Sequence, residues 1–473
     1  MDFISSVVGS ISGVLYNYVL IILLVVGGLY FTIRIKGAQF RLLGDQIKSV
    51  TEKSKDGKVS SFQALMVSTA SRVGTGNIIG VSTAICLGGF GAVLWMWIIA
   101  LLGGASAFIE STLAQIYKRK GKDGNSYGGP AYYIETAFKK RKWAKPLAIA
   151  FSIFLILTYG VGFNMLASYN LQSTFGIFEF YNPDVTPWII GGVVAFFVGL
   201  CLFGGGKRII KTTSFLVPLM GVAYILVALV VVVLNIGTIP CVFGEIFRSA
   251  FDFTAIFGGF AGSCVMYGIT RGLYSNEAGG GSAPNAAASA EVAHPVKQGL
   301  VQVLSVFIDT IVVCSATAFM CMTSGIEATP EVSGAAYVQQ SLAATLGDFG
   351  PIFVLAAMLL FAFTTLLGNL FYVDKAVIHI MGKEPGKKFK VVYNILASFF
   401  VFIGAGLSAG LLWDISDVFM GFMAVINIPV IFVLGKYAYR ALKDYEKQRK
   451  EGKEPVFVAK NIGLPHDVDY WQE

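Results

Sequence analysis

Apolar residues gather in eleven segments along the chain, and polar residues gather in the stretches between them. A helix needs about 20 predominantly apolar residues to cross the hydrocarbon core of a bilayer. The pattern therefore predicts an all-α polytopic membrane protein with about 11 transmembrane helices. The predicted spans are residues 14–34, 61–87, 89–116, 146–172, 188–204, 213–236, 255–291, 298–322, 350–372, 391–408 and 414–436.

Two of the predicted spans carry polar and helix-breaking residues at bilayer depth. The first contains "ASRVGTGNIIG" at residues 70–80, and the second contains "MYGITRGLYSNEAGGGSAPNAAASA" at residues 266–290. As one helix, residues 255–291 would be about 55 Å long, against a hydrocarbon core of about 30 Å. Glycine costs about 1 kcal/mol and proline about 3 kcal/mol in a helix interior, so both spans are predicted to be interrupted. Two alternatives stay open: close packing at the glycines and, for the second span, a hinge on the cytoplasmic side.

The two interrupted spans occupy equivalent places in two successive sets of five. Because five is an odd number, the second set enters the membrane from the opposite side, which gives an inverted-topology repeat. In transporters with such repeats, a matched pair of interrupted helices indicates the binding site. The predicted organisation is an extra N-terminal transmembrane helix with a cytoplasmic amphipathic segment (1–60), two five-helix repeats (61–236 and 255–437) and a charged cytoplasmic tail (438–473).

Basic residues alternate between the loops on the two predicted sides of the membrane. Residues 34–60 and 118–145 hold seven and nine Lys and Arg, whereas residues 173–187 and 323–349 hold none. Since Lys and Arg concentrate in cytoplasmic loops, the N-terminus is predicted outside and the C-terminus in the cytoplasm of a cell membrane. The net charge of +8 is explained in the same way and does not indicate nucleic-acid binding. Only 14% of the residues are charged, against about 25% in soluble domains.

Three segments mix polar and apolar residues outside the predicted spans. Residues 38–58 and 130–142 are predicted to be amphipathic segments on the cytoplasmic side, the second an interfacial helix with Tyr132 and Tyr133 at headgroup level. A solvated loop is the alternative for the second segment. Residues 438–473 are predicted to be partly helical and then disordered.

Cysteine and histidine give little indication of chemistry. The six cysteines fall mostly inside or at the ends of apolar segments and form no CxxC pair, so they are interpreted as packing residues. The three histidines, His294, His379 and His466, are scattered along the chain, which argues against a metal site.

Three longer motifs carry a family resemblance: "GTGNIIGVSTAI" (74–85), "GGFGAVLWMWIIALLG" (88–103) and "RGLYSNEAGGGSAPNAAA" (271–288). Together they resemble the alanine/glycine:cation symporter family over about residues 10–440. That family is similar in fold to LeuT-type transporters and couples small neutral amino acids to sodium or protons. The resemblance implies a LeuT-type 5+5 inverted repeat and sodium-coupled symport of alanine or glycine into the cytoplasm by alternating access. Proton-coupled symport is the alternative.

The same resemblance implies where substrate and ion bind at the first interruption. LeuT-type transporters break their first core helix at an "xGxGN" turn, which "VGTGN" at residues 73–77 matches. The match implies that the backbone at Thr75 and Gly76 holds the substrate carboxylate, as helix N-termini hold anions. It also implies that the carbonyls of Ala70 and Val73 bind the co-transported Na⁺.

The eighth core helix of LeuT-type transporters completes the ion site with a carbonyl and two hydroxyls at positions i, i+3 and i+4. Here "LLFAFTTLLGN" supplies Phe361, Thr364 and Thr365 at that spacing, and oxygen is the ligand that hard cations take. Alternatively, the two threonines bond to their own helix. The expected substrate site is completed by Asn77, Phe163, Asn164, Ile269, Gly272 and Asn276. Of these, Asn164 has the alternative role of a hydrogen bond between helices.

Two aspartates complete the candidate residues. Asp309 lies inside a predicted span and is a functional candidate, with Arg72 or Arg271 as an alternative ion-pair partner. Asp374 lies near a cytoplasmic helix end and is interpreted as solvated.

Other functional classes fit the sequence less well. An intramembrane enzyme needs a positioned acid, base or nucleophile at bilayer depth, and the predicted spans offer no such pair. A channel favours a symmetric pore lining, which the interrupted pair does not resemble. The chain is therefore predicted to be a secondary transporter and not an enzyme, with alanine or glycine and membrane lipid as partners. The oligomeric state is left open, and a monomer is compatible with the sequence.

Overall fold

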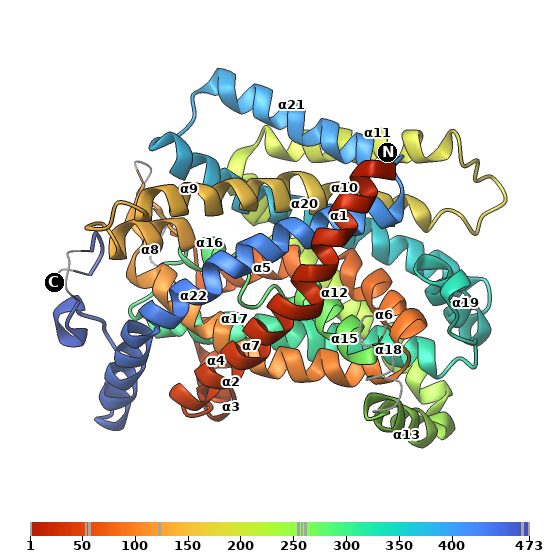
Figure 1. The fold of residues 1–473 in the computed structure, drawn as a ribbon, viewed down its shortest axis with the longest axis horizontal. Coiled ribbons are helices and arrows are strands. Elements are labelled where there is room, and N and C mark those ends of the chain that lie inside the picture. Colours follow the sequence, from red (N-terminus) through yellow and green to blue (C-terminus); the bar gives the residue numbers. More distant parts are fainter. Residues whose placement is uncertain are drawn as a thin grey trace.

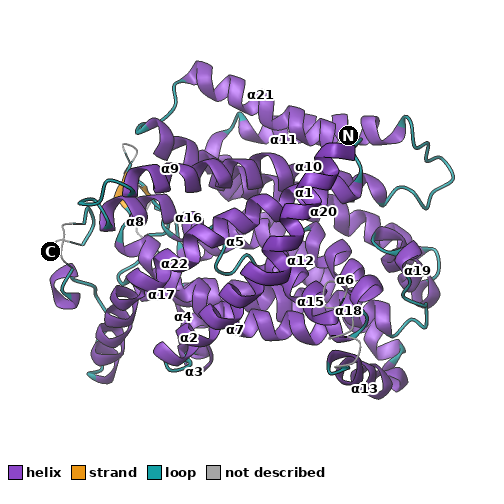
Figure 2. Cartoon of the chain, viewed as in Figure 1, coloured by secondary structure: helices purple, strands orange, loops and turns teal. Residues whose placement is uncertain are grey.

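The computed structural model describes residues 2–52, 54, 58–121, 124–252, 256, 259, 263–464 and 468–471, with side chains from residue 6 onward. Helices make up most of it, and the short antiparallel pair β1 (Arg119–Lys120) and β2 (Ser126–Tyr127) lies in one loop (Figures 1 and 2).

Within the described chain, seven helices are long and apolar enough to cross a membrane. Several of them contain a π-helical turn, so that three consecutive elements form one span. The seven are Ser6–Arg34 (α1 Asp2–Val14, η1 Leu15–Leu20 and α2 Ile21–Arg34), α7 (Gly91–Ile116), Ala144–Ser173 (α9 Ala144–Leu155, η3 Ile156–Gly162 and α10 Phe163–Ser173), α12 (Gly205–Leu234), Pro295–Met322 (α17 Pro295–Val306, η6 Phe307–Cys314 and α18 Ser315–Met322), α20 (Phe349–Met381) and α22 (Ala409–Lys450).

The other four predicted spans do not meet these limits of length and hydropathy in the described residues. Two are interrupted helices, and the others are α11 (Thr186–Leu202), which is short, and α21 (Lys387–Gly404), which begins with the basic stretch "KKFK". The predicted number of eleven is therefore not established, although each predicted range contains a helix. The interrupted pairs are α5 (Ser61–Arg72) with η2 (Gly76–Gly80) and α6 (Val81–Gly88), and α15 (Cys264–Asn276) with α16 (Pro284–Ala287).

Shorter helices lie in the loops at the two ends of the molecule. The sequence patterns predicted no separate helix at α13 (Ile239–Ala250) or α19 (Ala335–Leu346), which lie at the end opposite to the C-terminus (Figure 1). At the other end lie α3 (Ala38–Arg41), α4 (Leu43–Thr51), α8 (Pro130–Ala137) and the tail with η8 (Ala459–Ile462). We call this second end, which carries the basic loops 35–60, 118–143 and 382–390, the basic end.

The interrupted helices are enclosed by long unbroken ones. Helix α7 packs along both α15 and α17, and α5 packs against α12 and α20. By contrast, α11, α12 and α21 carry many exposed large apolar side chains, among them Phe196, Phe215 and Ile395. Exposed apolar surface of this extent is typical of contact with lipid, so the polar breaks lie inside the bundle and the apolar faces lie outside.

The expected position of the two tyrosines in α8 is wrong. Residues 130–137 do form a helix, as predicted, but Tyr132 and Tyr133 are buried rather than placed at headgroup level. The Tyr132 hydroxyl donates to the carbonyl of Lys375 at 2.9 Å, and the Tyr133 hydroxyl donates to Asn427. A phenol buried with a hydrogen-bond partner packs well in a protein interior, so α8 is part of the fold.

The charged tail is more ordered than its composition predicts. Helix α22 continues to Lys450, and the segment after it folds back onto the basic end. The amide of Phe457 donates to the carbonyl of Ala293 at 3.0 Å, and the indole of Trp471 donates to the carbonyl of Gln115 at 2.9 Å. These apolar side chains are buried, so the predicted disorder is wrong for this part of the tail.

The described histidines serve structural contacts. His294 caps α17 and lies 3.4 Å from a carboxylate oxygen of Asp444. His379 lies 3.1 Å from a carboxylate oxygen of Glu135. His466 lies outside the described residues. Of the six cysteines, four are buried, in agreement with a packing role, whereas Cys241 is exposed.

Candidate substrate and ion site

The first interruption begins where α5 ends. A capping box between Ser60 and Gln63 starts this helix, and Val73 leaves helical geometry with φ −76° and ψ 91°. Thr75 has returned to helical geometry (φ −62°, ψ −25°) ahead of the turns that begin at Gly76, so the break covers residues 73 and 74. The amide of Gly74, freed from the helix, donates to the Asn77 side-chain oxygen at 2.8 Å. The predicted interruption is therefore confirmed, although it is shorter than residues 73–77.

The second interruption follows α15. Glu277 has φ 55°, a left-handed conformation that is uncommon for any residue other than glycine. Gly279 and Gly281 follow with φ 86° and 84°, which their missing Cβ permits. Pro284 then starts α16, a position where a missing N–H costs nothing. The breakers of this motif therefore act as the sequence predicts.

The side chain of Glu277 joins the two interruptions. Ser71, in the last turn of α5, donates to one carboxylate oxygen at 2.9 Å, and Ser282 donates to the other at 2.7 Å. Glu277 is fully buried. Hydrogen bonds to a charged acceptor contribute about 1.5–3 kcal/mol, so this carboxylate holds the second break against the end of α5.

Asp309 makes a second connection. Its carboxylate accepts hydrogen bonds from Asn77, Ser275 and Thr310, each at 2.7 Å, and the side chain is fully buried. Asn77 belongs to the first interrupted helix and Ser275 to the second. Carboxylate and hydroxyl oxygens are the ligands that hard cations take, so this cluster could hold a cation.

The ion pair that was the alternative for Asp309 is absent from the described contacts. Arg72 donates instead to the side-chain oxygen of Gln302 at 3.0 Å. Arg271 lies 3.7 Å from Asp417 and stacks on the ring of Trp413 at 3.9 Å.

Glu110 and Asn427 also contact the second break, although in the sequence each is only a single polar residue in an apolar helix. Asn427 donates to Glu110 at 2.8 Å and to the carbonyl of Gly279 at 2.9 Å. The amide of Gly279 in turn donates to Glu110 at 3.4 Å. Glu110 and Asn427 are fully buried and hold the glycine-rich break from the side of α7 and α22.

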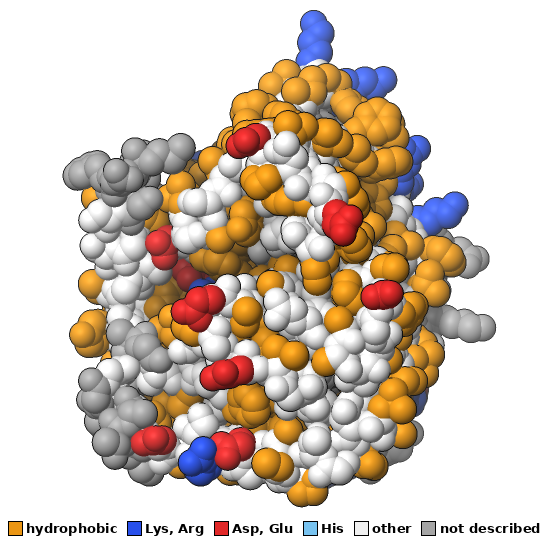
Figure 3. All heavy atoms as spheres, turned by 90° about the vertical axis from the view of Figure 1, so that its right-hand side faces the viewer, with side chains coloured by type: hydrophobic (Ala, Val, Ile, Leu, Met, Phe, Trp, Pro, Cys, Tyr) orange, Lys and Arg blue, Asp and Glu red, His pale blue; other side chains and the backbone are white. Residues whose placement is uncertain are grey.

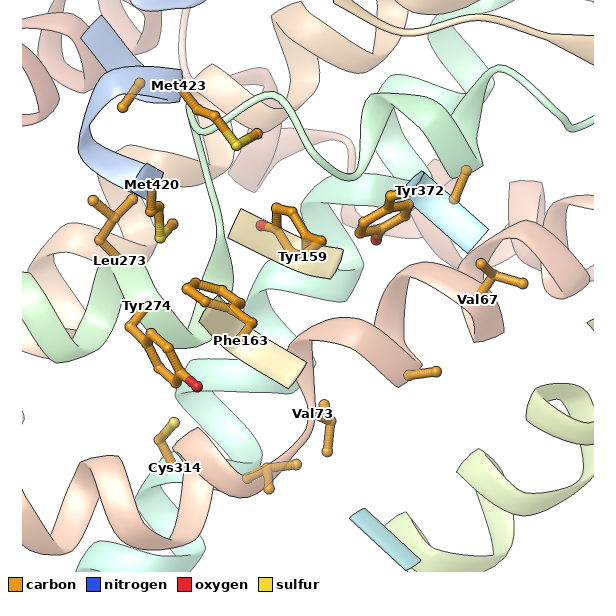
Figure 4. Close-up of a cluster of buried hydrophobic side chains, with 14 of the residues drawn as sticks. Val67, Val73, Tyr159, Phe163, Leu273, Tyr274, Cys314, Tyr372, Met420 and Met423 are labelled. Atoms are coloured by element: carbon orange, nitrogen blue, oxygen red, sulfur yellow. The ribbon is translucent and has the colours of Figure 1, made fainter. Parts of the chain in front are cut away.

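An aromatic cluster lies beside Gly76. The rings of Phe163 and Tyr274 lie next to each other, with centroids 4.6 Å apart, and Tyr159 lies 5.0 Å from Phe163 (Figure 4). A Cβ built on Gly76 would lie 2.5 Å from the Tyr274 ring. Trp413 packs on the other side of Tyr274 at 4.7 Å. Aromatic rings therefore fill the space next to the first break, and Tyr274 and Trp413 were missed by the sequence patterns.

The remaining predicted substrate residues divide into two groups. Thr75 accepts a hydrogen bond from Asn170 at 3.1 Å, and Asn164 accepts one from Asn369 at 2.9 Å. Asn276 donates to Thr310 at 3.4 Å and so belongs to the Asp309 cluster. These residues, together with the buried Ile269, lie within the enclosed helices.

Gly272 differs from them. A Cβ on this residue would lie 2.6 Å from Ile99 of α7, so its open side packs on a neighbouring helix.

The predicted sodium residues also divide. The Thr365 hydroxyl donates to the carbonyl of Ala70 at 3.1 Å and lies directly against Gly74. The Thr364 hydroxyl donates to its own helix, at the carbonyls of Leu360 (2.9 Å) and Phe361 (3.1 Å). The structure therefore brings Thr365 to the first break. For Thr364 it shows the bond to its own helix that the sequence left as an alternative.

The chain is similar to known sodium-coupled amino-acid symporters over nearly its whole length. The model of the sodium:alanine symporter family matches residues 1–459. The probable sodium/glutamine symporter GlnT of Bacillus subtilis is 42% identical over 98% of this chain and 95% of its own length. The sodium/alanine symporter AgcS of Methanococcus maripaludis is 36% identical over 95% of this chain and 99% of its own.

Solved structures show the same fold. The structure of MhsT in complex with L-phenylalanine covers 83% of this chain and 93% of its own, with a TM-score of 0.57 and 16% sequence identity. A manganese transporter of Eremococcus coleocola covers 85% and 84%, with a TM-score of 0.53 and 11% identity. The expected LeuT-type fold is therefore confirmed.

Proposed function

Since the chain belongs to the sodium:alanine symporter family, it is a multi-pass membrane transporter and not an enzyme, and we propose that it carries alanine or glycine into the cytoplasm together with Na⁺. The observation that carries the proposal is the meeting of the two interrupted helices through Glu277, Ser71 and Ser282. A pair of broken helices at one place supplies free backbone groups for a zwitterion and a cation. Alternating access then follows from movement of these helices relative to the unbroken ones.

The substrate is proposed to bind at the first break. Backbone amides at Thr75 and Gly76 would hold its carboxylate, as amides at helix N-termini hold anions. Tyr274 lies against Gly76, and Phe163 and Trp413 pack on Tyr274, which supports a substrate with a small side chain. The names of the relatives include both a glutamine and an alanine symporter, so side-chain size is the property to test.

Sodium is proposed to bind between the first break and α20. The carbonyls of Ala70, Val73 and Phe361 and the hydroxyls of Thr364 and Thr365 supply the oxygen ligands. The contact between Thr365 and the carbonyl of Ala70 supports this assignment. In the described structure Thr364 would have to rotate away from its own helix to reach the ion, so Thr365 is expected to contribute more.

The basic end is proposed to face the cytoplasm, with the N-terminus outside. Lys and Arg in loops favour that side, and they are concentrated at this end of the fold. The opposite end, seen in Figure 3, shows acidic side chains scattered over its face and basic ones mainly at its margin. Exposed acidic residues of its loops include Glu179, Asp184 and Glu331.

Uptake of labelled alanine into proteoliposomes tests the function. A sodium gradient alone should drive accumulation, and a proton gradient alone should not. Preloaded unlabelled alanine should exchange with labelled alanine in counterflow, because the binding site of a carrier can return across the membrane with substrate bound. Accumulation with a proton gradient and no sodium would contradict sodium coupling, and flux without exchange would contradict a carrier mechanism.

A further inference from the structure

A cavity of about 650 Å³ opens at the basic end between α12 and the start of α5. Three lysines line it: Lys58 just before α5, and Lys207 and Lys211 one turn apart on α12. Residues at i and i+4 share one face of a helix, so the α12 lysines lie side by side. Among the lining residues that the structure describes, none is Asp or Glu. Among the described lining residues, the positive charge of the three lysines is therefore not balanced by a carboxylate.

The neighbouring cavity has a different character. It shares Val59, Asn125, Lys207 and Ile210 with the first but also contains Asp374 and Glu384, so Lys207 borders both cavities. Asp374 pairs with Lys375 at 3.2 Å. The second cavity therefore contains both acidic and basic side chains, whereas the charged residues described in the first cavity are all lysines. Both cavities lie at the basic end, so the general excess of lysine and arginine there does not explain why only the second contains carboxylates among its described residues.

The apolar wall of the first cavity leads directly onto the outer face of α12. Ser214 and Phe215 line the cavity next to the lysines, and the Ser214 hydroxyl is buried without a partner in the described structure. From Phe215 a stripe of exposed apolar residues continues along the helix, each between 51% and 71% exposed: Leu219, Val222, Leu226, Leu229, Val230 and Val233.

The stripe has the length of a lipid-facing surface. Residues 215–233 of a helix extend over about 27 Å, close to the hydrocarbon thickness of about 30 Å. The two α12 lysines therefore lie just beyond the hydrocarbon core, at the level of lipid headgroups. A ligand that fits needs a negative headgroup for the lysines and acyl chains for the stripe.

We propose that this cavity binds the headgroup of an anionic phospholipid, whose acyl chains lie along the exposed face of α12. Basic pockets at the cytoplasmic side of transmembrane helices suit such headgroups.

The bound lipid would connect the unbroken helix α12 to the inner end of the interrupted helix α5. Lys58 contacts the carbonyl of Gly124, and the adjacent carbonyl of Val59 accepts a bond from the amide of Glu291 at 2.9 Å. Gln63, in the first turn of α5, also lines the cavity. A headgroup on Lys58 and the α12 lysines therefore holds the inner end of α5 against α12 and stabilises the conformation described here.

Titration of the purified full chain in neutral detergent tests the proposal. Dioleoyl phosphatidylglycerol is added, and the melting temperature is measured, with dioleoyl phosphatidylcholine as the neutral lipid. Phosphatidylglycerol should raise the melting temperature saturably and phosphatidylcholine should not. In the double variant Lys207→Gln/Lys211→Gln, half-saturation should require about 30-fold more phosphatidylglycerol, since each lysine near a lipid surface contributes about 1 kcal/mol.

The matched control is Lys387→Gln/Lys388→Gln, which removes two exposed lysines of the same end outside the cavity. This variant should keep the wild-type titration within about twofold. Equal weakening in both variants would overturn the proposal in favour of general surface charge. An unchanged titration in the α12 variant would overturn it as well. The same stabilisation by glycerol phosphate would show a site for free phosphate and not for a lipid.

Discussion

At the scale of single residues, Thr365 and Thr364 differ although they are adjacent. Thr365 contacts the Ala70 carbonyl at the first break, and Thr364 bonds to its own helix. A hydroxyl on a charged partner contributes about 1.5–3 kcal/mol. Thr365→Ala should therefore raise the sodium concentration for half-maximal uptake about tenfold or more. Thr364→Ala is the matched control and should shift it less than Thr365→Ala. Equal shifts, or none for Thr365→Ala, would count against this ion site.

Gly76 gives a test of the substrate position. A larger side chain would meet the Tyr274 ring, since a Cβ alone would lie 2.5 Å from it. Gly76→Val should abolish alanine binding, because the added bulk displaces the Tyr274 ring toward the proposed substrate position, and this overpacking should also lower the melting temperature. Gly221→Val is the control, since a Cβ there meets no atom within 4 Å. Normal alanine binding by the folded Gly76 variant would refute the site.

Glu277 gives a test of the connection between the breaks. Glu277→Gln removes the charge that Ser71 and Ser282 bond to. Because hydrogen bonds to a buried charge are strong, the variant should lose several degrees of melting temperature and at least tenfold in uptake rate. Glu245→Gln changes an exposed pair with Arg248, which contributes little, and should behave as wild type. Wild-type uptake by the Glu277 variant would show that transport does not depend on this carboxylate.

The contrast among these residues shows what a sequence reveals about a site. The meeting of Ala70 and Thr365 was implied by the family resemblance, because both sides match a motif of LeuT-type transporters. Glu110 and Asn427 are single polar residues in apolar helices, and their pairing joins positions 317 residues apart. Tyr274 and Trp413 look like ordinary packing aromatics until the fold places Tyr274 beside Gly76 and Trp413 against Tyr274. Such partners depend on tertiary contacts that no local pattern encodes.

At the scale of elements, both helix interruptions were predictable because glycines, with a proline in the second interruption, disfavour a helix locally. The tail was not, since its charged composition favours disorder while Phe457 and Trp471 find a surface elsewhere in the fold. The buried position of α8 was missed for the same reason. Amphipathic sequence indicates that a helix has an apolar face and does not say whether protein or lipid covers it.

The docked tail can be tested directly. The Trp471 ring packs edge-to-face against Phe457, with centroids 5.3 Å apart, and its indole N–H donates to the carbonyl of Gln115. Loss of a buried tryptophan side chain costs about 3–5 kcal/mol, so Trp471→Ala should speed tryptic cleavage within residues 453–460 at least tenfold. Trp143→Ala removes a half-exposed ring at the same end and should leave the cleavage rate near wild type. An unchanged rate in the Trp471 variant would mean that the tail is held without this ring.

At the scale of the whole molecule, the unbroken helices enclose two broken ones and expose apolar faces to lipid. This arrangement places the proposed sodium and alanine sites together, on residues 70–77 around the first break. If sodium and alanine each order this break, binding of one should strengthen binding of the other. The coupling free energy is the same in both directions. The all-α membrane class followed from composition and hydropathy, and the LeuT-type fold from the motif resemblance. The number of spans is not established, because α11 and α21 fall short of the usual length and apolar character.

The most direct test is a pair of binding titrations on the purified chain. Alanine affinity is measured at increasing sodium, and sodium affinity at increasing alanine, by equilibrium binding of the labelled ligand. The account predicts that sodium strengthens alanine binding about tenfold or more, that alanine strengthens sodium binding by the same factor, and that Thr365→Ala reduces both. Alanine affinity that does not change between zero and saturating sodium would contradict a shared site at the first break.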